Sequence, residues 1–577
     1  MRRGASGPRS GVVTLPLIAA LLMSLVAACT GAEPHQPTIT DKPGSGGTVR
    51  ILTYQKQLPL LDPQRDYTTA GWNMSQLITR TLTAFKPAPG KKGAQLEGDL
   101  ATDTGHHNAD STVWTYTLRS GVKWQTGDLL NCEDIRYGVL RNFDSRNKKP
   151  VVHGGPPYAT EWLDVPATYK GPRTDADKDS SVTGVKCVND KTIQFRLKKP
   201  EANFPYAVAM TSFAPVREKD DSWGDYATEP MSTGPYKLAK YTPAKGDTVG
   251  KAVFERNRYW DGKTDPVRTG SADKIVVELG IDIDSAAQQL TTGNPDYDNA
   301  VMLDQVPANF VSQVVNDKQL RTQTIHGPTS ATTYMSISTK TVPKVKCRQA
   351  LEYGFNKRKF LEVLGGKDLG DYATSILPPA DPAHRDFDIY GTEGKPDGDL
   401  DKAQQLLDDT KGCPAKLTLD VEDSERGKEM AKTIVDTYAR LGITVKTNKI
   451  SGDYYDKLNY LKNSHDLTIA GWASDWPGGS GTIPALFDGH LIKDGANSNY
   501  AQLDDKGIDS DIAAASRENS PDAAAKLWGD LDERIQKAAA VVPILYPRVL
   551  SLCGPKVRGA FLNAQVGAVN IASLGVE

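Results

Sequence analysis

The sequence has few cysteines, almost no excess charge and a single long apolar run, and each shortage excludes a class of protein. Six cysteines in 577 residues are too few for a small disulfide-built scaffold. The 69 basic and 71 acidic residues leave a net charge of −2, which gives no bulk attraction to nucleic acid or anionic lipid. With 38% apolar and 24% charged residues, the composition is that of a soluble globular protein. The length allows about four domains.

Short catalytic motifs are also missing. The chain contains no Gly-x-Ser-x-Gly, His-Glu-x-x-His or Cys-x-x-Cys pattern. Gly262-Lys263-Thr264 looks like the end of a phosphate loop, but Asn257 stands where that loop needs glycine. His106 and His107 have no third histidine nearby, and we interpret them as a solvated loop rather than metal ligands. These absences make an enzyme a weaker expectation without excluding one.

An acidic segment at 175–186 matches the opening of a calcium-binding loop, with Asp175, Asp177 and Asp179 at alternate positions. Ser180 replaces the glycine of such a loop, and Lys186 replaces its bidentate glutamate. We therefore expect a solvated acidic loop and leave calcium binding open.

The N-terminus has the pattern of an export signal. Arg2, Arg3 and Arg9 precede an uncharged apolar stretch at 11–28, which ends with small residues before Cys29. That boundary resembles the bacterial lipobox, in which cleavage leaves a diacylated cysteine as the first residue. Two or more acyl chains anchor a protein stably, so the pattern predicts a lipoprotein on the outer face of the bacterial cell membrane. The alternative is an uncleaved anchor with a coincidental cysteine.

Cleavage after residue 28 removes three arginines, which leaves 66 basic against 71 acidic residues and a net charge of −5. The segment at 29–46, rich in Pro, Gly and Thr, is predicted to be a flexible tether.

The rest of the chain mixes strand and helix patterns, which favours α/β lobes. Asn131 and Asp134 resemble a capping box that opens a helix with Ile135, Val139 and Phe143 on one face. Strands are predicted at 48–53, 113–118, 192–197, 274–279 and 443–447. The other predictions are a long loop at 146–180, a helix after Asp399 with Ala403, Leu406 and Leu407 inward, and a helix at 428–441.

Five cysteines remain once Cys29 is lipidated, and because five is odd at least one is free or pairs between chains. An exported location permits disulfides. We favour the pairs Cys132–Cys187 and Cys347–Cys413, with Cys553 buried and free. The alternative is that all five are reduced core residues.

Five segments, in order, resemble one known family. They are Asp99-Leu100-Ala101 with TVWTYTLRSGVKWQTGDLLNCEDIRYGVLR at 112–141, STGPYKL at 232–238 with ERNRYW at 255–260, CRQAL at 347–351 with Asn356-Lys357-Arg358, GWASDWP at 471–477, and VVPILY at 541–546. In this order they are similar to the family 5 extracellular solute-binding proteins, the receptors of peptide, dipeptide and nickel ABC importers. The resemblance extends over nearly all of residues 47–577.

The resemblance implies a two-lobed periplasmic-binding-protein-like α/β fold with a hinge and an extra subdomain in the first lobe. Carried over, lobe I spans 47–327, with its subdomain at about 68–205, lobe II spans 328–541, and 542–577 returns to lobe I. A ligand in the cleft between the lobes closes them by a hinge motion. The implied partners are a peptide and the ABC importer's permease subunits. We expect a monomer that is not an enzyme, with no cofactor, no metal and no nucleic acid.

The segment 471–477 is the candidate binding site. In the resembled family, the Asp of the Gly-Trp-x-x-Asp segment binds the peptide α-ammonium, and Asp475 stands at the matching place. Trp472 and Trp476 flank it, and aromatic rings beside a carboxylate suit a cationic or amphipathic ligand. Ala473 and Ser474 complete the predicted site.

Three functions stay open: capture of peptides, most simply oligopeptides; capture of another solute such as an oligosaccharide or a nickel complex; and hydrolysis outside the cell. The missing nucleophile motifs count against the third. No histidine pair stands in the predicted cleft segments, which counts against nickel. A dipeptide receptor needs a cation for the ligand carboxylate. We expect such a cation at the end of the strand that precedes the 428–441 helix. The uncharged Val421 stands there, and Arg426 is the nearest cation, so the sequence favours longer peptides.

Overall fold

The computed structural model describes residues 40–146, 149–150, 157–175, 181–451, 454–495, 497–563 and 565–577. The predicted signal peptide, Cys29 and the tether up to residue 39 lie outside these ranges, as do Asp177, Asp179 and Ser180 of the acidic loop. In the ranges given above, no helix is both long enough and apolar enough to cross a bilayer.

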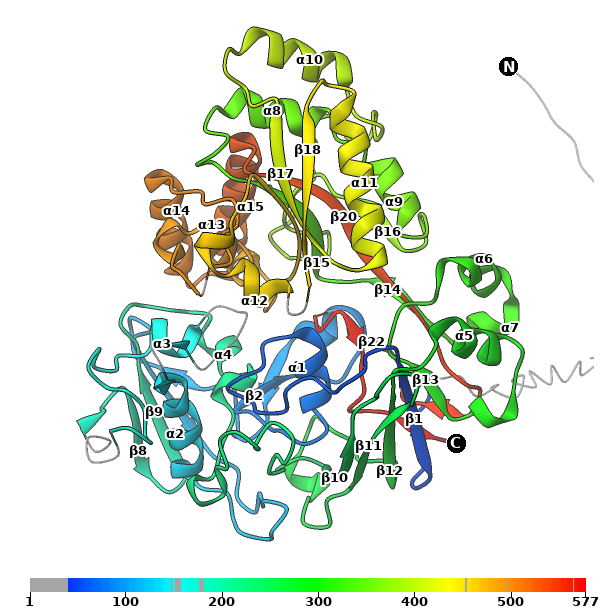
Figure 1. The fold of residues 1–577 in the computed structure, drawn as a ribbon. Helices are drawn as coiled ribbons and strands as arrows, with labels where there is room; N and C mark the ends of the chain where they lie inside the picture. The colour runs from blue at the N-terminus through cyan, green and yellow to red at the C-terminus, as the bar shows by residue number, and fades with distance from the viewer. Residues whose placement is uncertain are drawn as a thin grey trace, which may run out of the picture. The chain divides into compact units, whose positions relative to one another are not determined.

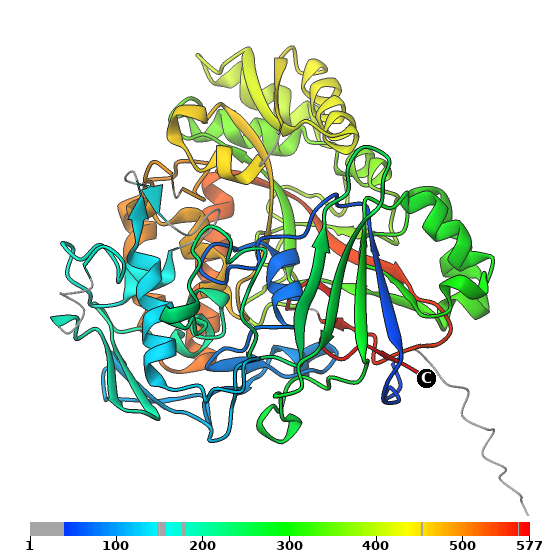
Figure 2. The same ribbon diagram turned by 60° about the horizontal axis from the view of Figure 1, so that its bottom comes forward.

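A five-stranded sheet is the centre of lobe I (Figure 2). Strand β1 (Thr48–Thr53) coincides with the predicted strand and pairs in parallel with the central strand β12 (Lys274–Leu279), with Ile51 opposite Val277. The strand order is β10 (Tyr236–Thr242), β11 (Gly250–Arg256), β12, β1, β13 (Ala300–Met302). The helices of this lobe are α1 (Thr69–Ser75), α5 (Ile283–Thr291), α6 (Ala308–Asn316) and α7 (Lys318–Arg321).

A separate four-stranded sheet forms the subdomain of lobe I. Its order is β4 (His106–His107), β5 (Val113–Thr117), β9 (Thr192–Arg196), β8 (Val185–Asn189), and the small pair β2 (Thr83–Phe85) and β3 (Leu96–Gly98) lies nearby in the chain. The alternation predicted for β5 is real, because Trp114 and Tyr116 are buried. His106 and His107 are exposed as predicted, but they form a short edge strand rather than a loop.

Helix α2 (Cys132–Leu140) begins with the predicted capping box. The Asn131 side chain accepts a hydrogen bond from the Asp134 amide at 3.2 Å, and the Asp134 carboxylate accepts one from the Asn131 amide at 3.2 Å. Ile135 and Val139 are buried as expected. Phe143 is not on this helix, because α2 ends at Leu140 and a short 3-10 turn follows.

The segment predicted as a long loop contains the short helix α3 (Tyr158–Trp162). A second short helix, α4 (Phe204–Ala207), follows β9 outside that segment. The loop prediction for 146–180 is therefore wrong at α3. The flanking segments are rich in Pro, Gly and Asp, and a helix of only five residues is too short to show a helical pattern against that composition.

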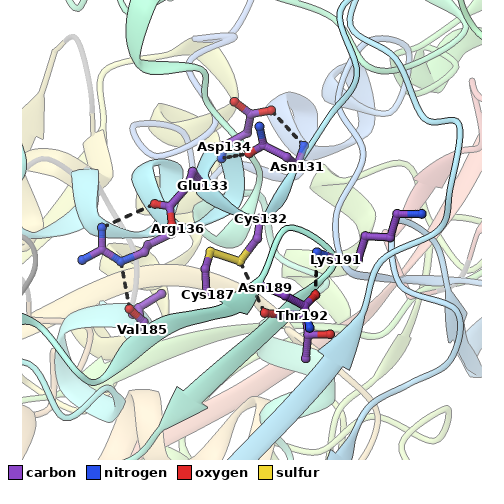
Figure 3. The surroundings of a disulfide bond; sticks show 10 residues. All are labelled: Asn131, Cys132, Glu133, Asp134, Arg136, Val185, Cys187, Asn189, Lys191 and Thr192. Atoms are coloured by element: carbon purple, nitrogen blue, oxygen red, sulfur yellow. Dashed lines mark hydrogen bonds and ion pairs between the residues drawn. A yellow bond between two sulfur atoms is a disulfide. The ribbon is translucent and has the colours of Figure 1, made fainter.

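Two disulfide bonds join the cysteine pairs favoured above. Cys132, the first residue of α2, is bonded to Cys187 in β8 (Figure 3), and Cys347 in α8 (Val345–Tyr353) is bonded to Cys413. Cys553 is buried and free. The first bond ties the start of α2 to the subdomain sheet.

A seven-stranded sheet is the centre of lobe II (Figure 1). Its main order is β14 (Thr324–Pro328), β20 (Val541–Leu552), β15 (Ala331–Ile337), β19 (Leu467–Ala473), β17 (Lys416–Glu422), β18 (Thr444–Ile450), and β16 (Gly370–Tyr372) pairs with β20. The helices are α8, α9 (Lys357–Val363), α10 (Leu400–Asp409), α11 (Glu425–Ala439), α12 (Tyr454–Leu458), α13 (Ile483–Phe487), α14 (Lys506–Ser516) and α15 (Pro521–Ala538).

Both helices predicted in this lobe are present, with corrected details. Asp399 caps α10 by accepting a hydrogen bond from the Lys402 amide. Ala403 is buried, and Leu406 and Leu407 are half-buried and pack against the lobe II core, as predicted. Helix α11 begins three residues earlier than predicted, because Ser424 caps it by accepting a hydrogen bond from the Gly427 amide.

Two chain segments pass between the lobes, and they pair with each other. Strand β14 leads from lobe I into lobe II, and the second half of β20 runs antiparallel to it on the way back, with Thr324 opposite Leu552. The chain then forms short strand pairs, β21 (Val557–Arg558) with β24 (Gly575–Val576) and β22 (Leu562–Asn563) with β23 (Ala568–Val569), whose apolar residues join the core of the five-stranded sheet.

Candidate functional site

Asp475 lies at the start of a tightly hydrogen-bonded loop that follows β19. The Asp475 amide donates to the Gly481 carbonyl at 3.1 Å, and the Gly481 amide donates to the Gly478 carbonyl at 2.9 Å. Gly478 has a φ of 95°, a conformation that side-chain-bearing residues rarely adopt. The glycines of this segment therefore let the loop fold back on Asp475 and fix its backbone.

The Asp475 carboxylate points into the subdomain of lobe I. The hydroxyls of Tyr67 and Tyr158 each donate a hydrogen bond to it, one to each oxygen. The residue is 7% exposed, and in the described part of the chain no cation pairs with it. Burial raises the pKa of Asp475 to about 7, and the hydrogen bonds from Tyr158 and Tyr67 act in the opposite direction. The result is a buried acid without a counter-charge.

Trp476, the next residue, is inserted into the aromatic core of the subdomain. Its ring is fully buried and lies 4.9 Å from the ring of Tyr158, 5.9 Å from Trp162 and 6.2 Å from Tyr206, measured between centroids. Its indole N–H donates to the Ser480 hydroxyl at 2.9 Å. A lobe II side chain thus completes a lobe I core, so contact between the lobes is built from apolar burial as well as hydrogen bonds.

The other three predicted site residues hold the segment in place. Trp472 is buried in lobe II, donates its indole N–H to the Gly481 carbonyl at 3.0 Å, and reaches Tyr67 across the boundary with ring centroids 6.4 Å apart. Ala473 ends β19 opposite Ala331. The Ser474 amide donates to the Ser330 carbonyl at 3.0 Å, and its own carbonyl accepts from Gln565 at 2.6 Å.

The sequence patterns did not identify the lobe I side of this contact. Helix α3 supplies three of its side chains: Tyr158 to Asp475, Trp162 to Trp476, and Glu161, which forms a 2.8 Å ion pair with Lys493 of lobe II. The spacing of Tyr158 and Trp162, four residues apart, is helical and was the available signal. Their partners are more than 300 residues away, so no local pattern could connect them.

The contact around Asp475 is closely packed. A cavity beside Tyr67 and Tyr158 has a volume of about 30 Å³ and is lined also by Asn142 and Thr211. That volume accommodates about one water molecule. A ligand larger than water therefore reaches Asp475 only when α3 and the 474–482 loop move apart.

A second group of charged and aromatic residues lies where the two lobes approach near β1 and α11. Tyr54 follows β1, is 54% exposed, and interacts electrostatically with Arg426 in the first turn of α11. Arg426 is exposed, and among the described residues its guanidinium has no hydrogen-bond or ion-pair partner. The guanidinium also interacts electrostatically with Glu422.

Three residues of lobe II form a group that could hold a metal ion. Asp488, His490 and Asp509 place one ligand atom each within 4.8 Å of one another. His490 is exposed, and its Nδ1 lies 2.8 Å from the Asp488 carboxylate. His326 bonds to the Asp368 carbonyl and His384 to the Leu377 carbonyl, so within the described ranges no histidine contacts Asp475.

Comparison with known proteins identifies the family. Residues 95–490 match the model of the bacterial extracellular solute-binding proteins, family 5 middle domain. The chain belongs to this family. The family 5 chain is 23% identical to the oligopeptide-binding protein OppA of Bacillus subtilis over 490 residues, covering 81% of this chain and 82% of OppA. It is 24% identical to the dipeptide-binding protein of Escherichia coli over 410 residues, covering 67% and 70%.

Solved structures show the same fold. The structure named clavulanic acid biosynthesis oligopeptide binding protein 2 is 28% identical, covers 94% of this family 5 chain and 97% of its own, and gives a TM-score of 0.83. The Helicobacter pylori DppA in complex with the peptide STSA is 20% identical, covers 91% and 98%, and gives a TM-score of 0.69. The fold is thus the two-lobed α/β fold of periplasmic peptide-binding proteins, with the subdomain in lobe I.

Proposed function

We propose that this family 5 protein is the substrate-binding lipoprotein of an ABC importer and captures free peptides between its lobes. The observation that carries the proposal is the Asp475 carboxylate, buried against Tyr67 and Tyr158 of the other lobe without a counter-charge. The relatives described above are named as oligopeptide-binding and dipeptide-binding proteins, which supports the same class of ligand.

The chemistry of the site suits the one group that all unmodified peptides share. An α-ammonium donates three hydrogen bonds and carries the positive charge that Asp475 lacks. The tyrosine hydroxyls, which now donate to Asp475, then turn to other acceptors or move away as the ammonium enters. Trp472 and Trp476 are buried beside Asp475, so the charged anchor has apolar surroundings.

Contacts to both lobes at once are what close a two-lobed receptor, because a ligand shifts the equilibrium only through its differential affinity for the two states. An ammonium on Asp475 bonds to lobe II while the peptide lies against α3 of lobe I. Arg426 is the cation we propose for an anionic group at the far end of the ligand, and backbone hydrogen bonds then serve the residues between them.

The domain bounds 47–327, 328–541 and 542–577 belong to the same proposal. So does the location: a protein exported by the signal at 1–28, acylated at Cys29, tethered through 29–46, and working as a monomer that delivers peptide to membrane permease subunits. The protein acts by binding and release, not by catalysis. Its composition, without strong net charge, suits this outer-face location.

Binding of a random-sequence pentapeptide mixture, measured by ultrafiltration and mass spectrometry, tests the function. A charge-assisted hydrogen bond in a closed site is worth roughly 1.5–3 kcal/mol, so Asp475→Asn should weaken binding of the free mixture by roughly 10- to 150-fold. N-acetylation of the mixture should cost the wild-type protein a similar factor, and the two losses should not add.

Full additivity, or equal binding of free and acetylated peptides by the wild-type protein, would contradict the peptide-ammonium assignment. Native mass spectrometry of the purified protein separates the remaining alternatives. A co-purified oligosaccharide or nickel complex would identify that solute, not a peptide, as the ligand. Turnover of chromogenic peptides or glycosides would show that the protein is a hydrolase.

A further inference from the structure

A second buried carboxylate, Asp381, is connected to the Asp475 loop by backbone hydrogen bonds. One Asp381 oxygen accepts a hydrogen bond from the Gly478 amide at 3.2 Å, and the other accepts one from the Ala383 amide at 2.7 Å. Asp381 is 6% exposed and lies 97 residues before Gly478 in the sequence. It joins the segment after β16 to the loop after β19.

The bond to Gly478 is the first of three that end at Asp475. The Gly478 carbonyl accepts from the Gly481 amide at 2.9 Å, and the Gly481 carbonyl accepts from the Asp475 amide at 3.1 Å. Successive hydrogen bonds of this kind polarise one another and hold a loop in one conformation. The backbone of the anchoring residue is therefore fixed through Asp381.

Packing fixes the conformation of the loop at Gly479 and Gly481 but not at Gly478, which is held by its hydrogen bond to Asp381. A side chain on Gly479 would collide with Trp528 of α15 at 2.6 Å, and one on Gly481 would collide with the Trp476 carbonyl at 2.4 Å, so both are held by packing. A side chain on Gly478 would meet nothing within 4 Å. Only its backbone, with φ at 95°, and its bond to Asp381 define the turn there.

A neighbouring carboxylate provides a contrast. Asp532 of α15 is fully buried and accepts hydrogen bonds from the Ile376 and Leu377 amides, each at 3.2 Å. It thus stabilises the segment that carries Asp381, and in the described structure it forms no hydrogen bond with residues 474–482. Asp381 and Asp532 are both buried carboxyl groups that accept hydrogen bonds from backbone amides. Only Asp381 accepts one from Gly478.

We infer that Asp381 is a positioning residue for peptide binding: through Gly478 and Gly481 it holds the Asp475 carboxylate where a peptide ammonium can bind. The inference rests on the proposed function. Asp381 touches no ligand in this arrangement and acts only through the loop. Its loss should therefore reduce the contribution of the ammonium more than the contribution of the rest of the peptide.

The experiment measures how strongly the full chain prefers the free pentapeptide mixture over its N-acetylated form. Asp381→Ala and Gly478→Ala should each reduce this preference by roughly 3- to 10-fold, as expected when a charge-assisted hydrogen bond is misaligned. Asp381→Asn, which keeps an oxygen acceptor, should restore most of it. Affinity for the acetylated mixture should stay within about twofold of the wild-type value.

Two matched variants serve as controls. Asp532→Asn removes the neighbouring buried carboxylate, and Gly442→Ala alters a glycine with φ at 72° and no atom within 4 Å, far from the loop. Both should leave the preference unchanged. If Asp381→Ala does not fold, Gly478→Ala still disturbs the same turn: its Cβ meets no atom within 4 Å, but the alanine strains the backbone at a φ of 95°.

The outcomes separate this inference from the function on which it rests. A wild-type protein without preference for free peptides contradicts the proposed function itself. A wild-type preference that Asp475→Asn abolishes but Asp381→Ala and Gly478→Ala leave intact overturns the role of Asp381 alone. Equal losses for free and acetylated peptides in the Asp381 variants would mean that Asp381 only stabilises the fold, which also overturns it.

Discussion

The hydroxyl of Tyr158 donates a hydrogen bond to the carboxylate of Asp475, a residue 317 positions later in the chain and in the other lobe. A tyrosine hydroxyl is a neutral donor, so it satisfies the geometry of the carboxylate but not its charge. The Asp475 carboxylate, which lies in the contact between the lobes, therefore still favours a cation as its partner.

Peptide affinity should depend on pH through Asp475. Burial raises the pKa of this acid to about 7, and an ammonium binds the ionised form, so binding below pH 7 must release the proton. Affinity should fall by up to about tenfold per pH unit as the pH drops below 7. Calorimetry at pH 6 in two buffers of different ionisation enthalpy should count close to one proton released. Binding at pH 6 without proton release would contradict this assignment.

Tyr158→Phe should move that pH dependence upward. The Tyr158 hydrogen bond lowers the pKa of Asp475, so its removal lets burial raise the pKa further. The midpoint of the affinity profile should then lie at a higher pH than in the wild-type protein. Tyr206→Phe is the matched control, since Tyr206 stacks on Trp476 but donates no hydrogen bond to Asp475 in the described structure. A shift of equal size in both variants would rule out this explanation.

The ligand-free protein should be more resistant to heat at pH 5.5 than at pH 8.5. Burial raises the pKa values of Asp381, Asp475 and Asp532 to about 7 in the folded protein. An acid with a raised pKa stabilises the fold fully below its unfolded pKa, and this contribution is lost as the pH rises through about 7. Carboxyls with lowered pKa, such as Asp530, are ionised across this window in both states and add no slope.

Thermal melting at both pH values measures this effect. Asp532→Asn should reduce the difference in melting temperature, because it removes one of the buried acids whose pKa is raised to about 7. A melting temperature that rises from pH 5.5 to 8.5 in the wild-type protein would show that these acids ionise without cost.

The disulfide between Cys132 and Cys187 should contribute measurably to stability. It closes a segment of 55 residues within the subdomain, and bonds of this kind are typically worth about 2–4 kcal/mol in free energy of unfolding. The double variant Cys132→Ala, Cys187→Ala should lose that amount in denaturant unfolding, and a reductant should bring the wild-type protein towards the same value. Mass mapping without reductant should recover the two peptides joined. Free thiols at both positions would refute the pairing.

Replacing Cys29 with Ala should release the protein from the membrane fraction while leaving its fold intact. The reason is the Val-Ala-Ala-Cys boundary, at which acylation of a single thiol supplies the anchor. Cell fractionation with a circular dichroism spectrum of the released protein checks both parts. Retention of the variant in washed membranes at the wild-type level would exclude a lipid anchor at Cys29.

Local patterns predicted the elements that depend on neighbours in sequence. The strand predicted at 48–53 matches β1, and Asn131 with Asp134 indicated the start of α2, because strand preference and helix capping are decided within a few residues. Residues 471–477 were singled out through the family resemblance. Tyr67, Tyr158 and Asp381 were not, since each acts on the 474–482 loop from a distant part of the chain.

The errors have the same origin. Helix α3 is five residues long and carries no strong helix signal, and its packing on Trp476 defines it. Phe143 follows the helical period of Ile135 and Val139, yet α2 ends at Leu140 before reaching it. Periodicity gives the face of a helix, but not the residue at which the helix ends.

Strand β20 has a consequence for the order in which the protein folds. It lies between β14 and β15, which are neighbours in sequence but not in the sheet. The last residues of the chain must therefore arrive before the sheet of lobe II can close, and contacts between such distant residues form slowly. A chain still emerging from the ribosome cannot complete either lobe, because the strand pairs after β20 also belong to the core of lobe I. This delay suits the export proposed above, because only an incompletely folded chain can pass through a narrow channel.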